Sequence, residues 1–105
     1  MPKYLVQGSY TDQGLTGLLK EGGSKRRAMA EHLVNEMGGK LEAFYYTFGS
    51  DDFVIILDLP SNIEMAATAI VAQASGIVKS RVTVLMTPED VDQAVQRKVD
   101  FRPPE

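Results

Sequence analysis

The chain has 105 residues, a formal net charge of −3 at pH 7, a hydrophobic fraction of 44% and a charged fraction of 24%. These values are ordinary for a globular protein, and the length allows one domain and one hydrophobic core, residues 1–105. Cysteine is absent, which excludes disulfides, thiolate nucleophiles and cysteine-ligated zinc. The acidic balance argues against nucleic acid as a partner, because nucleic acid binds basic surfaces.

The apolar segments are all short. None approaches the roughly 20 residues that span a bilayer, and the apolar run at residues 4–6 is too short for the core of a signal peptide. We therefore expect a soluble, cytoplasmic protein with no membrane partner.

The first half of the chain predicts a strand followed by two helical pieces. Residues 3–10 alternate as a strand does, and the leucines of residues 15–20 have helical spacing that ends at the double glycine 22–23. Ser24 should cap a second helix that runs to about Met37 and ends at Gly38-Gly39. The apolar side of this helix, which should face a sheet, carries Met29, Ala30, Leu33, Val34 and Met37.

The second half predicts two strands, a helix and a further strand. Residues 40–48 alternate, with Leu41, Ala43 and Tyr45 expected on one face, and the continuous apolar run 53–57 is typical of a central strand. The helix after Pro60 should begin at a reciprocal capping box formed by Ser61 and Glu64. Its sheet-facing stripe is predicted to be Ile63, Ala66, Ala67, Ile70, Val71 and Ala74.

The chain ends with an alternating strand, a short helix and a tail. Residues 78–86 alternate, Thr87 and Pro88 are expected to start the short helix, and residues 99–105 form an extended tail. The order β-α-β-β-α-β predicts an α+β fold, a ferredoxin-like plait whose four-stranded antiparallel sheet has its first and third strands in the middle. Both main helices should cover one face. We expect another copy of the chain to cover the helix-free face, which makes a homo-oligomer.

Several segments at fixed spacings point to one family. They are residues 3–11, residues 17–24 with Arg27, residues 38–42 leading to 48–53, and residues 85–89. Together they resemble the GYD-domain family of small bacterial proteins, with the departure that Asp51 stands where a tyrosine is common. The resemblance covers nearly the whole chain. It implies a fold related to ferredoxin-like and dimeric α/β-barrel proteins, and it implies no particular reaction.

The basic turn between the two helical pieces is a candidate anion site. Two glycines before a helix let the backbone approach a ligand, the free N–H groups of a helix start favour an anion, and arginine suits carboxylate or phosphate. Arg26 falls on the apolar side of the helix. The alternative is a glycine hinge with a solvated basic surface. The candidate residues are Lys20, Gly22, Gly23, Ser24, Arg26 and Arg27.

Other polar and aromatic residues give weaker signals. His32, the only histidine, is a possible general base but falls on the polar flank of its helix, where a surface histidine is the simpler interpretation. Aromatic residues near the first two strands, Tyr10 and Tyr45 among them, could line an apolar pocket with hydroxyl groups, or simply serve core and interface. Asp51, Asp52 and Asp58 fit turns better than a metal or acid–base group.

Two functions from different classes remain open. The first is a homo-oligomer that binds a small anionic ligand between sheet and helices. The second is a cofactor-free enzyme of the dimeric α/β-barrel kind, an oxygenase or isomerase acting on a small aromatic substrate. No catalytic constellation is recognisable, which favours the first, whereas an enclosed pocket containing His32 or a buried tyrosine would favour the second. Neither function calls for a cofactor or a metal.

Overall fold

The computed structural model describes residues 1–104, so the last residue of the expected tail lies outside the described part. The elements follow in the order β1 (Lys3–Tyr10), α1 (Asp12–Glu21), α2 (Gly23–Glu36), β2 (Lys40–Tyr46), β3 (Phe53–Asp58), α3 (Asn62–Ala74), β4 (Val78–Leu85) and α4 (Pro88–Gln96). The strands form one antiparallel sheet in the order β2-β3-β1-β4. The predicted α+β plait is confirmed, with the first and third strands in the middle.

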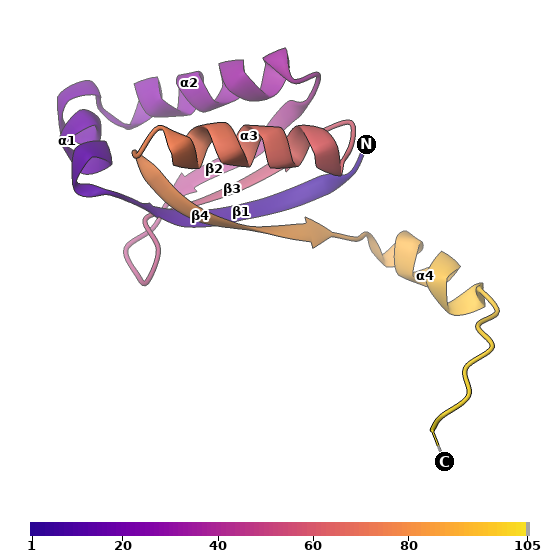
Figure 1. The fold of residues 1–105 in the computed structure, drawn as a ribbon. Helices are drawn as coiled ribbons and strands as arrows, with labels where there is room; N and C mark the ends of the chain where they lie inside the picture. Colours follow the sequence, from indigo (N-terminus) through magenta and orange to yellow (C-terminus); the bar gives the residue numbers. More distant parts are fainter. Residues whose placement is uncertain (105) are drawn as a thin grey trace.

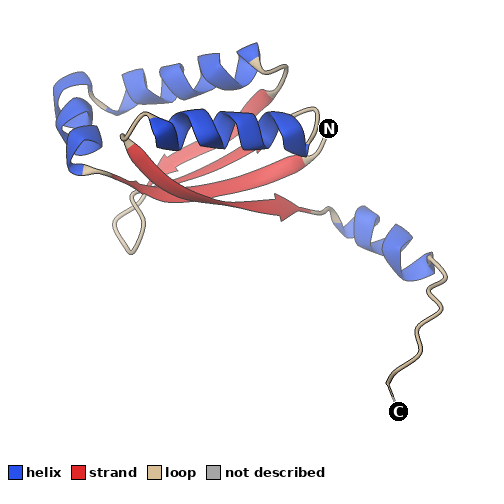
Figure 2. Cartoon of the chain, in the orientation of Figure 1, coloured by secondary structure: helices blue, strands red, loops and turns tan. Residues whose placement is uncertain are grey.

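The domain has two layers. Helices α2 and α3 lie side by side over one face of the sheet, and α1 closes one end of the helical layer (Figures 1 and 2). Among the described residues no helix covers the opposite face, which we call the free sheet face. It consists of alternate strand residues, with Leu5, Val54 and Ile56 near its middle.

A β-bulge in β2 changes which side chains share a face. The pairing with β3 shifts between Leu41 and Ala43, so Leu41 lies on the helix-covered side while Ala43 and Tyr45 lie on the free sheet face. The prediction that these three residues share a face was therefore wrong. Because of the shift, Phe44 joins Leu41 beneath the helices.

Helix α2 begins two residues earlier than predicted, at Gly23. Gly22 is its N-cap with φ +86°, a left-handed conformation that glycine adopts without strain, and no side chain caps the helix. Ser24 is thus the second helical residue and not the cap. The predicted inner side is otherwise correct: Leu33 and Met37 are half-buried and Val34 is buried, although Met29 remains 50% exposed.

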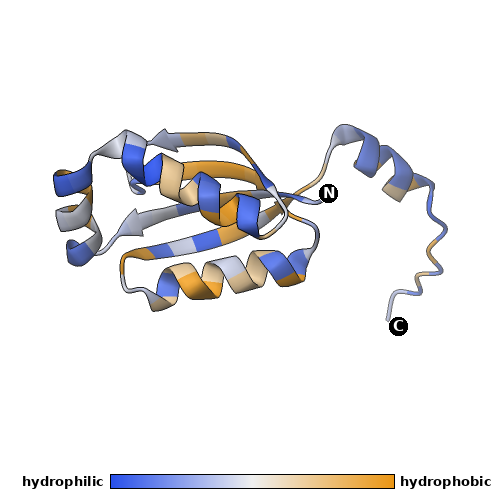
Figure 3. Cartoon of the chain, turned by 90° about the horizontal axis from the view of Figure 1, so that it is seen from above, coloured by the Kyte–Doolittle hydropathy of each residue, from blue (hydrophilic) through white to orange (hydrophobic). Residues whose placement is uncertain are grey.

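Helix α3 turns a different side to the sheet than expected. Met65 and Thr68 are buried, and Ala69 and Ala72 are half-buried, whereas Ile63, Ile70 and Val71, predicted to face inward, are exposed. Figure 3 shows this helix from above, with hydrophobic colours recurring along its length. Most of the circumference of α3 is apolar, so periodicity alone does not define its buried side.

The start of α3 also differs in detail from a capping box. Ser61 Oγ accepts a hydrogen bond from the backbone N–H of Ile63 at 3.1 Å, and the Ser61 hydroxyl donates to Glu64. Ser61 is the predicted N-cap, but the carboxylate of Glu64 accepts from the hydroxyl and not from the backbone N–H that a reciprocal box requires.

The core lies between the sheet and the two main helices. Seven apolar side chains are buried there: Tyr4, Val6, Val34, Phe53, Leu57, Leu59 and Met65. The hydroxyl of Tyr4 donates to Asn62 Oδ1 at 2.5 Å, which gives the buried phenol a partner and ties β1 to the first turn of α3. No helix among residues 1–104 is long and apolar enough to span a membrane.

Candidate functional site

A cavity of about 350 Å³ lies between the helix-covered side of the sheet and helices α2 and α3. Most of its wall is apolar and includes Phe44 and Phe53 from the sheet, Leu33 from α2 and Ala72 from α3. The small residues that α3 turns inward, Ala69 and Ala72, leave room that larger side chains would fill. The few polar side chains on the wall are Tyr10, Arg26, Thr68 and Ser80.

Arg26 brings the only charged group to this wall among the described residues. It lies in the first turn of α2, on the side that faces the sheet, and its side chain is only 11% exposed. Guanidinium Nη2 lies 3.3 Å from Glu21 Oε1 at the end of α1. A Cβ at Gly17 would overlap the same Nη2, so a glycine in α1 gives the guanidinium the room it occupies.

The Nε atom of Arg26 is buried and has no hydrogen-bond partner within residues 1–104. Leaving a buried donor unsatisfied costs roughly 1–3 kcal/mol, and more for a charged group. Glu21 thus holds one side of the guanidinium, while the Nε donor stays unpaired in a residue that lines an apolar cavity. That arrangement suits a carboxylate or another anionic oxygen.

Tyr10, at the end of β1, also lines the cavity. Its ring packs on Phe53 with centroids 5.3 Å apart, and its backbone N–H donates to Asp52 Oδ2 at 2.9 Å. Burial, and then the hydrogen bond with Tyr46, raise the pKa of Tyr10 above the ordinary value of 10.0. The phenol therefore keeps its proton to a higher pH than an ordinary tyrosine, and its oxygen can accept a hydrogen bond from a bound group.

A second cavity of about 340 Å³ shares Tyr10 with the first and lies beneath the α1–α2 turn. Tyr46 forms part of its wall, and the Tyr46 hydroxyl donates to the backbone oxygen of Gly23 at 3.0 Å. A Cβ on Gly23 would come within 2.9 Å of the Tyr46 ring, so glycine is needed for this contact. Phe48, in the β2–β3 loop, is fully exposed although it also contributes to the wall.

The structure divides the predicted site residues among separate places. Arg26 and Tyr10 meet at the first cavity, and Gly23 lies at the second. Tyr45 is 67% exposed on the free sheet face. The remaining predicted residues are exposed and line neither cavity: Lys20, Gly22, Ser24, Arg27 and His32.

His32 lies on the outer side of α2, as its position on the polar flank indicated. Its Nε2 is 3.0 Å from Glu36 Oε1, one helical turn further along, and the side chain is 74% exposed. Of the basic residues predicted for the anion site, only Arg26 lines either cavity. Gly17 and Glu21, which position that side chain, carry no recognisable sequence signal, because their role depends on how α1 meets α2.

The three aspartates serve structural contacts. Asp51 receives two hydrogen bonds from the Arg81 guanidinium, at 2.9 and 3.0 Å, Asp52 accepts from the backbone of Tyr10, and Asp58 pairs with Lys3 at 2.9 Å. Within residues 1–104 no group of three or more His, Cys, Asp or Glu side chains is placed to hold a metal ion.

Comparison with known families matches the chain to a family. Residues 4–95 match the GYD domain, and this range covers most of the chain. The protein therefore belongs to the GYD domain family, as the sequence resemblance indicated. No match to a curated protein was found.

Proposed function

We propose that this member of the GYD domain family is a homo-oligomer that binds a small monoanionic ligand with an apolar body in the cavity between the sheet and helices α2 and α3. The observation that carries the proposal is Arg26, the charged residue of an apolar cavity wall, whose buried Nε has no partner in the described chain. A carboxylate bound there would satisfy the donor, while the apolar part of the ligand would contact Phe44 and Phe53.

The charges around Arg26 favour one negative charge on the ligand. Glu21 lies against the guanidinium and neutralises it in part, so a second negative charge on the ligand would be repelled by that carboxylate. The largely apolar wall offers few donors for the remaining oxygens of phosphate. An aromatic or branched aliphatic monocarboxylate therefore fits better than inorganic phosphate or a dicarboxylate.

The oligomeric part of the proposal rests on the free sheet face. Leu5, Val54 and Ile56 form its apolar middle and are only partly covered, and Tyr45 is 67% exposed beside them. Ion pairs at the margin, such as Arg81 with Asp51, add polar groups around this apolar centre. An apolar centre with a polar rim is the usual composition of a protein interface.

Thermal unfolding in the presence of chosen anions tests the ligand. Benzoate, hexanoate, phosphate and chloride are compared at equal ionic strength. A ligand present at ten times its dissociation constant stabilises the folded state by about 1.4 kcal/mol, which for a domain of this size raises the melting temperature by several degrees, roughly 5–10 °C. Benzoate or hexanoate should produce this rise, and phosphate and chloride should not.

A matched pair of variants locates the site. Arg26→Gln and Arg27→Gln remove the same charge from neighbouring positions of α2, but only Arg26 lines the cavity. The rise should disappear in Arg26→Gln and persist in Arg27→Gln. Equal responses of the two variants, or no response of the parent protein to either carboxylate, would contradict the proposal.

One observation keeps the enzymatic alternative in view. Tyr10 is half-buried and lines the cavity, where its hydroxyl suits a polar contact that orients an enclosed aromatic substrate. His32 lies outside the cavity and offers no base to it. Turnover of a bound aromatic compound that Tyr10→Phe abolishes, with binding unchanged, would favour the enzyme over the binding protein.

A further inference from the structure

Helix α4 and the tail that follows it stand apart from the domain. They project from the end of β4 (Figure 1), and every described residue from Met86 to Pro104 is exposed. The Cα radius of gyration is 16.9 Å and the longest extent is 58 Å, whereas a compact domain of this length has a radius of gyration of about 13 Å. The difference reflects this arm, residues 86–104.

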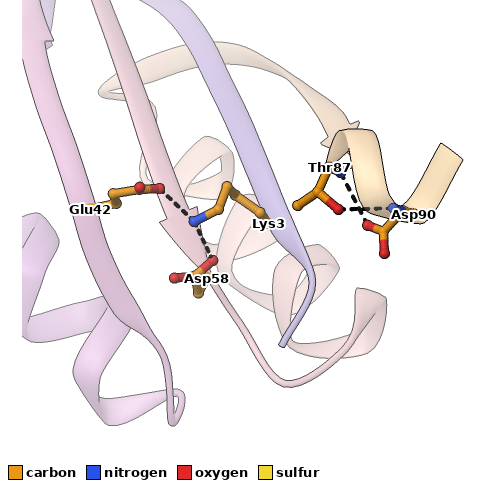
Figure 4. Close-up of polar contacts among 5 residues, drawn as sticks. All are labelled: Lys3, Glu42, Asp58, Thr87 and Asp90. Carbon is orange, nitrogen blue, oxygen red and sulfur yellow. Dashed lines mark hydrogen bonds and ion pairs between the residues drawn. The ribbon is translucent and has the colours of Figure 1, made fainter. Parts of the chain in front are cut away.

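Helix α4, within the arm, has the features of a helix that packs against another surface. Figure 4 shows its first turn closed by a full capping box, with Thr87 Oγ1 accepting from the Asp90 N–H at 3.0 Å and Asp90 Oδ2 accepting from the Thr87 N–H at 3.1 Å. Val91 and Val95 lie one turn apart on one side and are 47% and 75% exposed. A helix of nine residues is too short to be stable alone in water, so its order requires a partner surface.

The direction of the arm relates it to the free sheet face. In Figure 1 α4 lies toward the side of the sheet opposite α2 and α3, and the β2–β3 loop extends to the same side at the other end of the sheet. Only Met86 and Thr87 separate β4 from α4, and Thr87 is extended with φ −74° and ψ 160°. So short and extended a connection carries the helix away from its own sheet and does not fold it back.

We propose that α4 is an exchange arm, whose Val91–Val95 side packs on a second copy of the chain seated on the free sheet face. The inference rests on the homo-oligomer proposed above and adds the segment that clasps it. In a two-fold dimer each copy contributes its arm and receives the arm of the other copy. The free sheet face and the Val91–Val95 side of α4 are then buried in the same interface.

Charge supports a second copy as the occupant. The first turns of α4 are acidic, with Glu89, Asp90 and Asp92 exposed. On the free sheet face, Lys40 and Lys79 lie exposed on the two edge strands, β2 and β4. The acidic first turns of α4 and the lysines at the two edges of the face are complementary in charge between copies of the same chain.

Two full-length double variants test the arm. Val91→Asp with Val95→Asp places two charges on its apolar side, and Gln93→Asp with Gln96→Asp places the same two charges on its opposite side. Sedimentation velocity over a concentration series measures the dimer dissociation constant. It should be at least tenfold higher for the valine pair and should change by less than twofold for the glutamine pair. Equal dissociation constants for the two variants would overturn the inference.

A mixing experiment decides whether the arm reaches a second copy. The chain has no cysteine, so Gln96→Cys gives one site for a nitroxide label outside the Val91–Val95 side of α4. The labelled chain, without ¹⁵N, is mixed with unlabelled ¹⁵N chain, and broadening of ¹⁵N amide signals then reports contact between copies only. Signals of the free sheet face and its edges should broaden.

The outcomes separate the arm from the oligomer and from the ligand. A dimer without intermolecular broadening overturns the arm and leaves the sheet-face dimer standing. A monomer at every concentration overturns both, whereas ligand binding is measured separately through Arg26.

Discussion

Filling the cavity with a larger side chain tests whether the space between sheet and helices is real. Ala72 of α3 lines the cavity and is half-buried. Ala72→Leu adds three carbon atoms, which at about 0.8 kcal/mol per buried methylene group would contribute roughly 2.4 kcal/mol if fully buried. The cavity is partly open, so about half is expected, and leucine's side-chain entropy and slightly lower helix propensity remove a further few tenths to about 1 kcal/mol.

The expected net effect is a free energy of unfolding that is higher by about 0.5 kcal/mol, with a ligand site that no longer binds. In a close-packed core the same substitution would overpack and cost about 1–3 kcal/mol. The two cases therefore differ in sign. Urea denaturation, with the slope checked for constancy, measures the change. Ala66→Leu, on the exposed side of the same helix, is the control and should change the stability by less than about 0.5 kcal/mol. A loss of 1 kcal/mol or more in Ala72→Leu alone would refute the reasoning.

Three further predictions concern single positions. Gly17→Ala should displace the Arg26 guanidinium and weaken carboxylate binding about tenfold, while the unfolding free energy stays the same or rises because alanine favours a helix over glycine by about 1 kcal/mol. Carboxylate binding of unchanged strength would show that the guanidinium need not occupy this position. Because the pKa of Tyr10 is raised in the folded protein, Tyr10 of the unfolded chain ionises first, and the free energy of unfolding should fall as pH rises above 10. The fall should be less steep in Tyr10→Phe, and an equal pH dependence of the two proteins in urea denaturation would contradict this prediction. Ser61→Ala should lower the unfolding free energy by about 1 kcal/mol, and an unchanged urea midpoint would mean that the cap contributes nothing.

The plan of the fold could be predicted because its signals are local. Alternation in residues 3–10, the glycines at positions 38 and 39 and the apolar run of β3 each report a strand or a helix end without reference to the rest of the chain. Right-handed crossovers then fix the strand order. The bulge after Leu41 escaped prediction because one extra residue in a strand leaves the local pattern almost unchanged.

The site was only partly predictable because it depends on packing between elements. Arg26 could be recognised as an arginine on the apolar side of a helix, which is unusual in itself. The cavity beside it could not, since it results from α3 turning Thr68 and Ala72 inward and Ile70 outward. The sequence of an almost wholly apolar helix such as α3 does not indicate which side will be covered. The covered side depends on how the two ends of the helix join the sheet.

The most direct test of the account observes the Arg26 Nε–H group itself. A ¹H–¹⁵N spectrum of the arginine side chains is recorded during titration with benzoate, with chloride at equal ionic strength as control, and the Arg26 signal is assigned by its absence in Arg26→Lys. The account predicts that the Nε–H proton moves to higher chemical shift in a saturable way as the carboxylate accepts its hydrogen bond, while the other arginine signals stay in place. An Arg26 signal that follows the chloride control at every benzoate concentration would contradict the claim that this buried donor holds the ligand.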